Sequence, residues 1–390
     1  MGPGAPAPGN PHRHRGPSDW QHFDWLLAGA VAAISGFGAL MVYTATRDSL
    51  QAQGLSPQYY FKKQSVFLVI GFVVMLVVAA SDYRRYRQFA APIYGLSLAA
   101  LLGVYVVGHK SKGAQAWFQF GSYQVEPSEF AKIALIVALA SYLAVFKGRL
   151  PARGFVVVLV MALIPFTLIY KQPDLGTALV LLAVLLALLL VGGARGRHMA
   201  VLGVLALIGV VGVVQLGVLK TYQKERLTSF VNSPDAPAQA LIAAKVKGSQ
   251  YNLAQSKLTI ANGGITGRGI GKGTQTNLAY VPEQRTDFIF TAVGEQVGLV
   301  GSSLLLGLFC IVVWRTWRAA SLARDQAGGL ICVGVLAMLV FQVFENIGMT
   351  MGIMPVAGIP LPFMSYGGSA VVASFAGIGL VLNVGMRRFS

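Results

Sequence analysis

Asp287 is the residue of this sequence that is best placed to do chemistry. It follows a long polar stretch, residues 220–285, and stands directly before a strongly apolar segment, residues 288–313. A carboxylate at the mouth of an apolar helix is partly desolvated, and desolvation raises its pKa toward the range of a useful general base. A structural role is the alternative, because Thr286 and Asp287 are both residue types that suit the cap of a helix.

A second candidate site opens another apolar segment, at the string Pro-Ser-Glu-Phe-Ala-Lys of residues 127–132. Ser128 is predicted to cap a helix, and Glu129 in its first turn suits the helix dipole. Glu129 and Lys132 are three residues apart and therefore share one face of that helix. A cap with one ion pair would explain these residues. A cation inside a membrane helix is costly, however, and usually faces a cavity, where Lys132 could hold a diphosphate.

Three further polar segments interrupt the apolar runs. Asp174 lies at a predicted helix start, where it either suits the helix dipole or binds a cation or a sugar hydroxyl. Trp117 is predicted in a loop, as an interfacial anchor or as a surface that stacks on a sugar. Residues 354–369 contain three prolines and three glycines. Such backbone at membrane depth needs protein or a wet cavity around it. Unless this stretch is a simple hairpin, Ser365 and Gly368 offer hydroxyl and N–H donors to a polar ligand.

The composition places these residues in a membrane protein. The chain is 55% hydrophobic and only 12% charged, whereas soluble domains carry roughly 25% charged residues. Its net charge of +17 would suggest nucleic acid in a soluble protein, but no aromatic and basic recognition motif accompanies it. Much of the excess lies in short loops between apolar runs. This distribution indicates membrane topology and contact with membrane lipids or a lipid-linked substrate, with no nucleic acid.

About 20 apolar residues cross a bilayer, and the sequence predicts ten such segments. They are Asp24–Tyr43, Ser65–Ala80, Phe89–Val107, Phe130–Phe146, Gly154–Tyr170, Leu175–Val191, His198–Leu219, Phe288–Val313, Ala327–Met349 and Gly367–Gly385. Alternate loops are rich in arginine, which predicts that their side and both termini are cytoplasmic. The expected fold class is an all-α integral membrane protein with ten transmembrane helices. A large extracytoplasmic loop, residues 220–286, would join the seventh helix to the eighth.

Residues 19–390 are predicted to form a single membrane domain, and residues 1–18 a disordered cytoplasmic tail. Every candidate residue falls on the side opposite to the arginine-rich loops, which predicts an extracytoplasmic reaction on a membrane-bound substrate. In the large loop, residues 238–260 have the pattern of an interfacial amphipathic helix. Residues 271–274, Gly-Lys-Gly-Thr, are similar to part of a phosphate loop. The spacing and the residue after the lysine do not match, which argues against an ATP site.

Six segments, taken together, resemble the shape, elongation, division and sporulation family of bacterial membrane glycosyltransferases. They are Lys112–Trp117, Pro127–Lys132, Gln172–Thr177, Gln255–Lys257, Pro282–Phe290 and Pro355–Ser369. The resemblance covers nearly the whole chain after residue 18, and the string Gly-Thr-Gln at residues 273–275 is more like the elongation members. It implies ten transmembrane helices with both termini inside. The implied activity is polymerisation of lipid II into glycan strands at the outer face of the bacterial cytoplasmic membrane.

The resemblance also implies roles for individual residues. The family's catalytic aspartate falls on Asp287, and its loop tryptophan falls on Trp117. The family has a helix that begins with Pro-Ser-Glu and carries a lysine, and these residues correspond to Glu129 and Lys132 here. The family also has a basic residue before a glutamine in its second helix, and Lys63 matches that residue. A class B penicillin-binding protein, which supplies the transpeptidase, is the implied partner.

The implied chemistry is a single, inverting displacement. A sugar 4-hydroxyl attacks an anomeric carbon that carries a lipid diphosphate, Asp287 takes the hydroxyl proton, and undecaprenyl diphosphate leaves. Lys132, Lys63 and Arg285 would neutralise the diphosphates, and a divalent cation, Mg²⁺ or Mn²⁺, is the other agent that the sequence leaves open. Two competing functions remain. One is a transporter that moves lipid II across the membrane, and the other is a scaffold that only anchors the partner.

Overall fold

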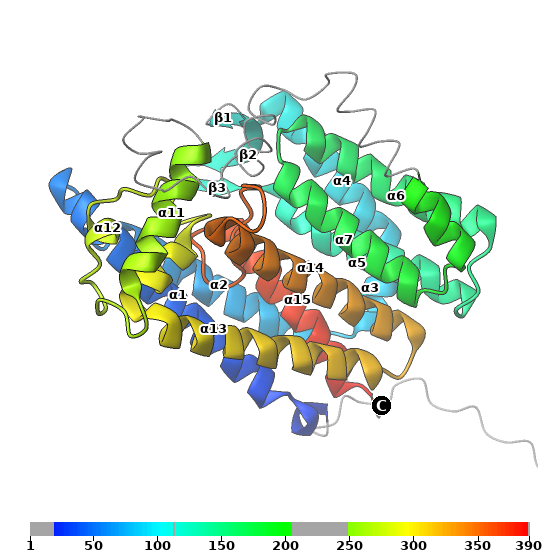
Figure 1. Ribbon diagram of the computed structural model, residues 1–390. Helices are drawn as coiled ribbons and strands as arrows, with labels where there is room; N and C mark the ends of the chain where they lie inside the picture. The colour runs from blue at the N-terminus through cyan, green and yellow to red at the C-terminus, as the bar shows by residue number, and fades with distance from the viewer. Residues whose placement is uncertain (1–18, 112–113, 205–248, 389–390) are drawn as a thin grey trace, which may run out of the picture.

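The structure is a computed structural model that describes residues 19–111, 114–204 and 249–388 (Figure 1). The predicted tail, residues 1–18, lies outside the described residues. The elements in chain order are η1 (Asp19–His22), α1 (Trp25–Ala52), α2 (Tyr59–Ala80), α3 (Tyr83–Gln88), α4 (Ala90–Val107), β1 (His109–Ser111), β2 (Ala114–Phe120), β3 (Tyr123–Val125), α5 (Pro127–Leu143), η2 (Ala144–Phe146), α6 (Ala152–Lys171), α7 (Leu175–Val191), α11 (Ser249–Gly263), α12 (Thr274–Asn277), α13 (Ile289–Ser321), α14 (Gln326–Met351) and α15 (Gly368–Met386).

The long helices confirm a multi-pass membrane protein. Among the described residues, eight helices are long and apolar enough to cross a bilayer: α1, α2, α4, α5 with η2, α6, α13, α14 and α15. α7 is equally apolar but has 17 residues, which agrees with the short sixth segment of the sequence. The seventh predicted segment, His198–Leu219, lies outside the described residues from position 205 onward. The number ten and the cytoplasmic side of the termini therefore stay predictions.

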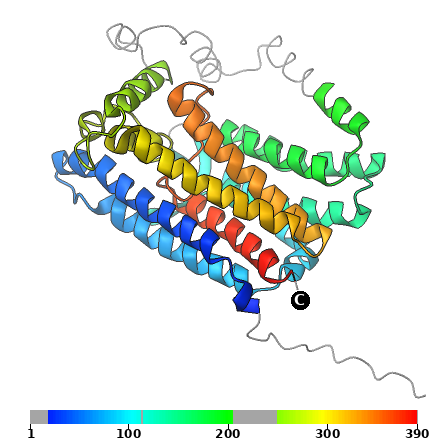
Figure 2. The ribbon, with the colours of Figure 1, turned by 60° about the horizontal axis from the view of Figure 1, so that its bottom comes forward.

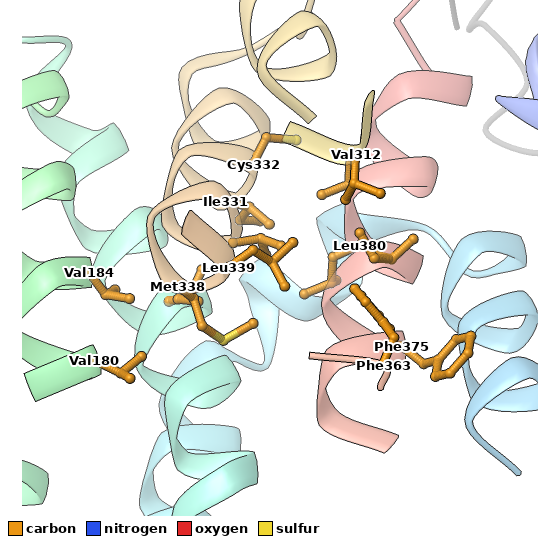
Figure 3. Close-up of a cluster of buried hydrophobic side chains, with 14 of the residues drawn as sticks. Val180, Val184, Val312, Ile331, Cys332, Met338, Leu339, Phe363, Phe375 and Leu380 are labelled. Atoms are coloured by element: carbon orange, nitrogen blue, oxygen red, sulfur yellow. The ribbon is translucent and has the colours of Figure 1, made fainter. Parts of the chain in front are cut away.

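α15 lies at the centre of the bundle, and its packing sets the core. Of its most apolar stretch 78% is buried, against 22% for α2 and 17% for α4, so α2 and α4 turn most of their surface outward. Figure 3 shows Met338 and Leu339 of α14 between Val180 of α7 and Phe375 of α15. These side chains are apolar throughout, so the core alone does not bring polar groups together. Most candidate site residues lie near the beginnings of helices and in the loops between them.

Small residues let α2 and α15 approach each other closely. A Cβ at Gly71 of α2 would lie 2.6 Å from the ring of Phe375, and a Cβ at Gly379 would lie 2.8 Å from the carbonyl oxygen of Met75. Glycine at such positions is common where membrane helices touch, because apolar lipid provides no hydrophobic drive and close van der Waals contact must hold the pair. The contact fixes where α15 begins, and thereby the position of the loop before it.

The segment between α4 and α5 is a small antiparallel sheet, which corrects the loop that the all-α prediction assigned. β1 pairs with β2, and β2 pairs with β3. The amide of Gln115 in β2 donates to the carbonyl oxygens of Val104 and Tyr105 at 3.0 and 3.2 Å. The Val104 carbonyl also accepts the N–H of Gly108, the C-cap of α4 (2.8 Å), so the Gln115 amide ties the sheet to the last turn of this helix. Trp117 therefore lies in a strand.

The described part of the large loop packs against the bundle. α11 contacts α13 and α14, and its buried residues include Leu253, Ser256 and Thr259. The Ser256 hydroxyl donates to the carbonyl oxygen of Thr350 at the end of α14 (2.6 Å). For residues 249–260 the predicted helix is thus confirmed, and the face that packs against the bundle carries both apolar and polar side chains. Residues 238–248 lie outside the described part of the chain.

A buried carboxylate holds the turn before α12. Glu295 of α13 is fully buried and accepts hydrogen bonds from the backbone N–H groups of Gln275 and Thr276 (2.9 and 2.8 Å) and from the Thr276 hydroxyl. A Cβ at Gly273 would lie 2.5 Å from the same carboxylate. The N–H groups that directly follow residues 271–274 therefore bind a carboxylate of this chain. The absence of an ATP site stays a prediction.

Candidate active site

Asp287 lies in a turn, one residue before the cap of α13. The N-cap of α13 is Phe288, so the structural alternative, a capping role for Thr286 or Asp287, is wrong. The Asp287 side chain is half-buried, and one carboxylate oxygen lies 3.3 Å from where a Cβ would stand on Gly358. Its backbone carbonyl accepts a hydrogen bond from the amide of Asn346 (2.7 Å). The turn therefore holds the carboxylate against the loop between α14 and α15.

Asn346 joins this turn to that loop. Its side-chain amide also donates to the carbonyl oxygen of Ile359 (2.7 Å), and the residue is fully buried in α14. The sequence marks Glu345 and Asn346 as polar residues inside an apolar helix, with either a functional or a packing role. For Asn346 the contact is a packing contact, but one that positions Asp287. Sequence reasoning did not include it among the site residues.

Arg285, two residues before Asp287, stacks on an aromatic cluster. Its guanidinium lies 4.3 Å from the ring centre of Tyr60, and the rings of Tyr60 and Tyr366 are 5.1 Å apart, edge to face. The Tyr366 N–H donates to the Arg285 carbonyl oxygen (2.9 Å). Among the described residues, the buried Nε of Arg285 has no hydrogen-bond partner. Burial raises the pKa of Tyr366 to about 12, so its hydroxyl keeps its proton at neutral pH. A cation and a hydroxyl donor thus lie side by side.

Lys63 contacts the adjoining rings of the same cluster. Its ammonium lies 4.6 Å from the ring centre of Tyr59 and 5.3 Å from that of Tyr123. It also donates to a backbone carbonyl in the β2–β3 turn (2.9 Å). The Tyr59 ring is 5.1 Å from the Tyr60 ring, on which Arg285 stacks. The structure therefore brings the two predicted cations to one group of tyrosines.

Glu129 and Lys132 form the ion pair that their spacing predicts. The ammonium nitrogen lies 2.8 Å from a Glu129 carboxylate oxygen, and the two side chains are 4% and 1% exposed. The predicted cap is wrong, because α5 begins at Pro127 and Glu126 occupies the N-cap position. Ser128 instead donates its hydroxyl to the Glu126 carboxylate (2.8 Å).

Glu126 is a site residue that sequence reasoning missed. Its carboxylate accepts the indole N–H of Trp117 (3.1 Å), and its backbone N–H donates to the Ser369 hydroxyl (2.9 Å). Burial, and then the nearby charges of Asp174 and Glu129, raise the pKa of Glu126 to about 8. The sequence feature that could have indicated Glu126 is its position directly before the Pro-Ser-Glu string, at the beginning of a membrane helix.

Asp174 lies at the start of α7, as the sequence predicts, and occupies the N-cap position directly before the first turn. One carboxylate oxygen accepts the N–H of Thr177 (3.0 Å), and the other is buried with no hydrogen-bond partner among the described residues. Burial raises the pKa of Asp174. The charged groups that act on Asp174 are Lys132 and Glu129, near the beginning of α5. The structure therefore brings together three carboxyl groups and one ammonium group, those of Glu126, Glu129, Asp174 and Lys132.

Ser365 and Gly368 make contacts inside the protein. The Ser365 hydroxyl accepts the N–H of Leu361 (2.8 Å), and its carbonyl oxygen accepts the amide of Gln64 (3.1 Å). Ser365 is buried, and a Cβ at Gly368 would lie 2.4 Å from the ring of Phe67. Both residues hold the loop and the beginning of α15 in place. Their predicted contact with substrate stays a prediction.

The loop between α14 and α15 contacts elements that carry both groups of predicted residues. Gly358 touches Asp287, and Tyr366 binds the backbone of Arg285. On its other side, a Cβ at Gly176 in the first turn of α7 would lie 2.6 Å from Ile359. One group of residues is thus Asp287, Arg285 and Lys63. The second group is Trp117, Glu126, Glu129, Lys132 and Asp174.

The fold and the site define a multi-pass membrane protein whose candidate site residues lie at the beginnings of α5, α7 and α13 and in the loop before α15. Residues 24–389 match the model of the FtsW/RodA/SpoVE family, which is described as "Cell cycle protein". The chain therefore belongs to this family. This confirms the family that the six sequence segments indicate.

Relatives with three different names match almost the whole chain. The chain is 34% identical to "Probable peptidoglycan glycosyltransferase FtsW" of Trichlorobacter lovleyi, over 95% of each chain. It is 34% identical to "Stage V sporulation protein E" of Bacillus subtilis, over 93% of this chain and 96% of the relative. It is 32% identical to "Peptidoglycan glycosyltransferase MrdB" of Escherichia coli, over 95% of each. Sequence identity therefore does not favour one of these three names over the others.

Two solved structures have the same fold. One belongs to a study described as "Structural coordination of polymerization and crosslinking by a peptidoglycan synthase complex", with a TM-score of 0.77 at 34% identity, over 95% of this chain and all of the other. The other is the rod shape determining protein RodA of Thermus thermophilus, with a TM-score of 0.67 at 31% identity, over 95% and 99%.

Proposed function

We propose that this protein polymerises lipid II into glycan strands at the outer face of the cytoplasmic membrane and releases undecaprenyl diphosphate. As a member of its family, it is a peptidoglycan glycosyltransferase. The observation that carries the finer proposal is the turn of Asp287. There a half-buried carboxylate stands two residues from a guanidinium whose Nε is buried with no hydrogen-bond partner among the described residues. A base and a site for an anionic leaving group are the two parts that this transfer needs.

In this proposal Asp287 takes the proton of the attacking sugar 4-hydroxyl. Arg285 and Lys63, which share one aromatic cluster, neutralise the diphosphate. Tyr366 supports them as a hydrogen-bond donor, since burial raises its pKa to about 12. Charge neutralisation of this kind stabilises the leaving group as negative charge develops on it.

The second group of residues would bind the sugars. The indole of Trp117 is fixed in a strand by its hydrogen bond to Glu126, and Asp174 offers a buried carboxylate oxygen to a hydroxyl. Lys132 is only 1% exposed and is paired with Glu129. We therefore infer that Lys132 acts by fixing Glu129, in place of the direct contact with a diphosphate that the sequence predicts.

A divalent cation would supply further neutralisation of the diphosphate when bound. Among the described residues, no group of three His, Cys, Asp or Glu side chains is arranged to hold one. Mg²⁺ needs only one or two carboxylates beside substrate phosphates, and Asp287 is the carboxylate that would provide such a ligand. Mg²⁺ or Mn²⁺ therefore stays an expectation that a chelator experiment can test.

The partner and the biological setting extend the proposal. One structural neighbour comes from a peptidoglycan synthase complex, which supports a class B penicillin-binding protein as partner. The elongation role follows from the string Gly-Thr-Gln at residues 273–275. The extracytoplasmic position of the site follows from the arginine-rich loops on the opposite side.

The decisive experiment incubates purified protein with labelled lipid II, alone and with the partner, and compares Asp287→Asn with the wild type. We expect folded Asp287→Asn to lose polymerisation by at least about 10²-fold, the lower range for removal of a general base. Asp82→Asn is the matched control, because Asp82 caps α3 at the other end of α2 and Asn caps equally well. Wild-type rates for Asp287→Asn would refute the base assignment. Lipid II that crosses vesicles without polymerising would indicate a transporter, and inactivity of every form would indicate a scaffold.

A further inference from the structure

A second polar site lies at the opposite end of the bundle from Asp287. There η1 and the beginning of α1 meet the last turns of α13 and the end of α15 (Figure 2). These elements enclose a pocket of about 220 Å³. That volume is below the ~300–1,000 Å³ of sites for drug-sized molecules. It suits a compact polar group.

The charges that line this pocket are mainly positive. Its lining includes three arginines, Arg315, Arg318 and Arg388, and one carboxylate, Asp24. With His22 neutral, these three positive charges and one negative charge give the lining a formal charge of +2. Asp24 is already engaged, because one of its oxygens caps α1 at Leu27 and the other lies 2.7 Å from Nε of Arg315. The charge that remains for an outside ligand is that of Arg318, because Arg315 is paired with Asp24 and Arg388 has an interaction within the chain.

Arg318 is the cation best placed to act on such a ligand. It is exposed, and within the described part of the chain its guanidinium has no hydrogen bond or ion pair. A guanidinium presents its N–H groups as a planar fork that matches two oxygens of a phosphate. The site consequently combines a pocket, excess positive charge and a donor that no carboxylate of the described chain occupies.

Exposed tryptophans place this pocket at the level of the lipid headgroups. Trp25, Trp314 and Trp317 are 75%, 52% and 55% exposed and lie on the same two helices that line the pocket. The Arg315 guanidinium lies 5.4 Å from the ring centre of Trp314. Tryptophans gather at membrane–water interfaces because the ring is apolar and its N–H is polar. A ligand at this depth would be a lipid headgroup.

We propose that this pocket binds the phosphate of an anionic phospholipid. The site is independent of the proposed glycosyl transfer, since it lies at the other end of the bundle and shares no residue with it. An anchored lipid there would hold η1, α13 and α15 together at the membrane surface. Each cation near an anionic headgroup contributes about 1 kcal/mol, so loss of one cation is expected to weaken binding about fivefold.

The test measures lipid retention by the purified full-length protein in detergent, using native mass spectrometry. Phosphatidylglycerol and phosphatidylcholine with identical acyl chains are the probes. We expect the wild type to prefer phosphatidylglycerol, and Arg318→Gln to bind it about fivefold more weakly. Arg324→Gln, an exposed arginine at the same end that does not line the pocket, removes the same charge and should change affinity less than twofold. Arg318→Lys should keep most of the preference.

Three outcomes would overturn the proposal. Equal losses in the Arg318 and Arg324 variants would mean that general electrostatic attraction explains the retention. Equal binding of the two lipids would mean that the pocket does not distinguish an anionic headgroup from a zwitterionic one. Binding of soluble glycerol phosphate as tight as that of the lipid would make the ligand a soluble phosphate. Because Arg318 is exposed and unpaired among the described residues, its replacement should cost little stability, and an unchanged unfolding midpoint checks this.

Discussion

Asn346 holds the backbone of Asp287 in place. Its buried amide donates to the carbonyl oxygen of Asp287 and to that of Ile359, each at 2.7 Å. A buried carbonyl group without a partner costs about 1–3 kcal/mol. The amide therefore fixes the turn that carries the carboxylate relative to the loop that touches it.

Replacement of Asn346 by leucine should impair catalysis more than substrate binding. The change leaves two carbonyl groups unpaired, so we expect a loss of about 1–3 kcal/mol of stability for each that stays buried. A displacement of the reacting group by about 1 Å can cost roughly 10²-fold in rate, so kcat should fall while KM changes little. Initial rates on lipid II and thermal unfolding in detergent are the measurements.

Gln342→Leu is the control for this variant, because Gln342 is a buried amide one turn earlier on the same helix. Equal rates in the two variants would contradict a positioning role for Asn346.

Gly358→Ala should reduce activity through its contact with Asp287. Gly358 has a φ of +77°, and its added Cβ would lie 3.3 Å from an Asp287 carboxylate oxygen. Gly54 has a φ of +70° with open space around it, so Gly54→Ala carries the same backbone strain, about 1–2 kcal/mol, without the contact. Both variants should therefore unfold at similarly lowered temperatures, but only Gly358→Ala should polymerise lipid II more slowly. Matching activities would indicate strain alone.

The membrane helices and part of the site follow from local sequence patterns. Runs of apolar residues predict the spans because the bilayer requires a helix of fixed length. The Glu129–Lys132 pair follows from spacing on one helix, and Asp287 stands out because polarity changes abruptly at that position. Each of these inferences uses residues that are close in the sequence, within one predicted helix or at its end.

The remaining features depend on contacts between distant segments. The sheet at residues 109–125 consists of strands of three to seven residues, too short for a periodic signal, and pairing stabilises it. Glu126 approaches Asp174 only because α5 packs against α7. The role of Asn346 likewise appears only once α14 meets the Asp287 turn. Such contacts leave no trace in local residue patterns.

The stability of the protein should fall as the pH rises from about 5 to about 8, and Glu126→Gln should remove much of this dependence. Burial and neighbouring carboxylates raise the pKa of Glu126 from 4.5 to about 8. Between these values the folded protein keeps a proton that the unfolded chain releases, so stability declines by at most about 1.4 kcal/mol per pH unit. Below pH 4.5 both states are protonated, and above pH 8 both are ionised.

Unfolding midpoints of wild type and Glu126→Gln between pH 5 and 9 measure this effect. The glutamine cannot ionise, so its curve should be flatter and should lie above the wild type at pH 8. Asp82 lies outside the group of Glu126, Glu129, Asp174 and Lys132, so the unfolding midpoint of Asp82→Asn should change with pH in the same way as that of the wild type. Parallel curves for Glu126→Gln as well would mean that the carboxyl group is already ionised in the folded protein at neutral pH.

A double substitution separates the structural role of Lys132 from a direct role on a diphosphate. Lys132→Met alone leaves the Glu129 carboxylate buried without its cation, and breaking a buried pair costs about 3–5 kcal/mol. Lys132→Met combined with Glu129→Gln removes both charges and should regain most of that stability. If Lys132 acts only by fixing Glu129, Glu129→Gln alone and the double variant should polymerise lipid II at equal rates. If Lys132 holds a diphosphate itself, the double variant should be slower than Glu129→Gln by tenfold or more, since a lost contact to a charged group costs about 1.5–3 kcal/mol. We expect equal rates, because a lysine that is 1% exposed cannot reach a lipid-borne diphosphate without first breaking its ion pair.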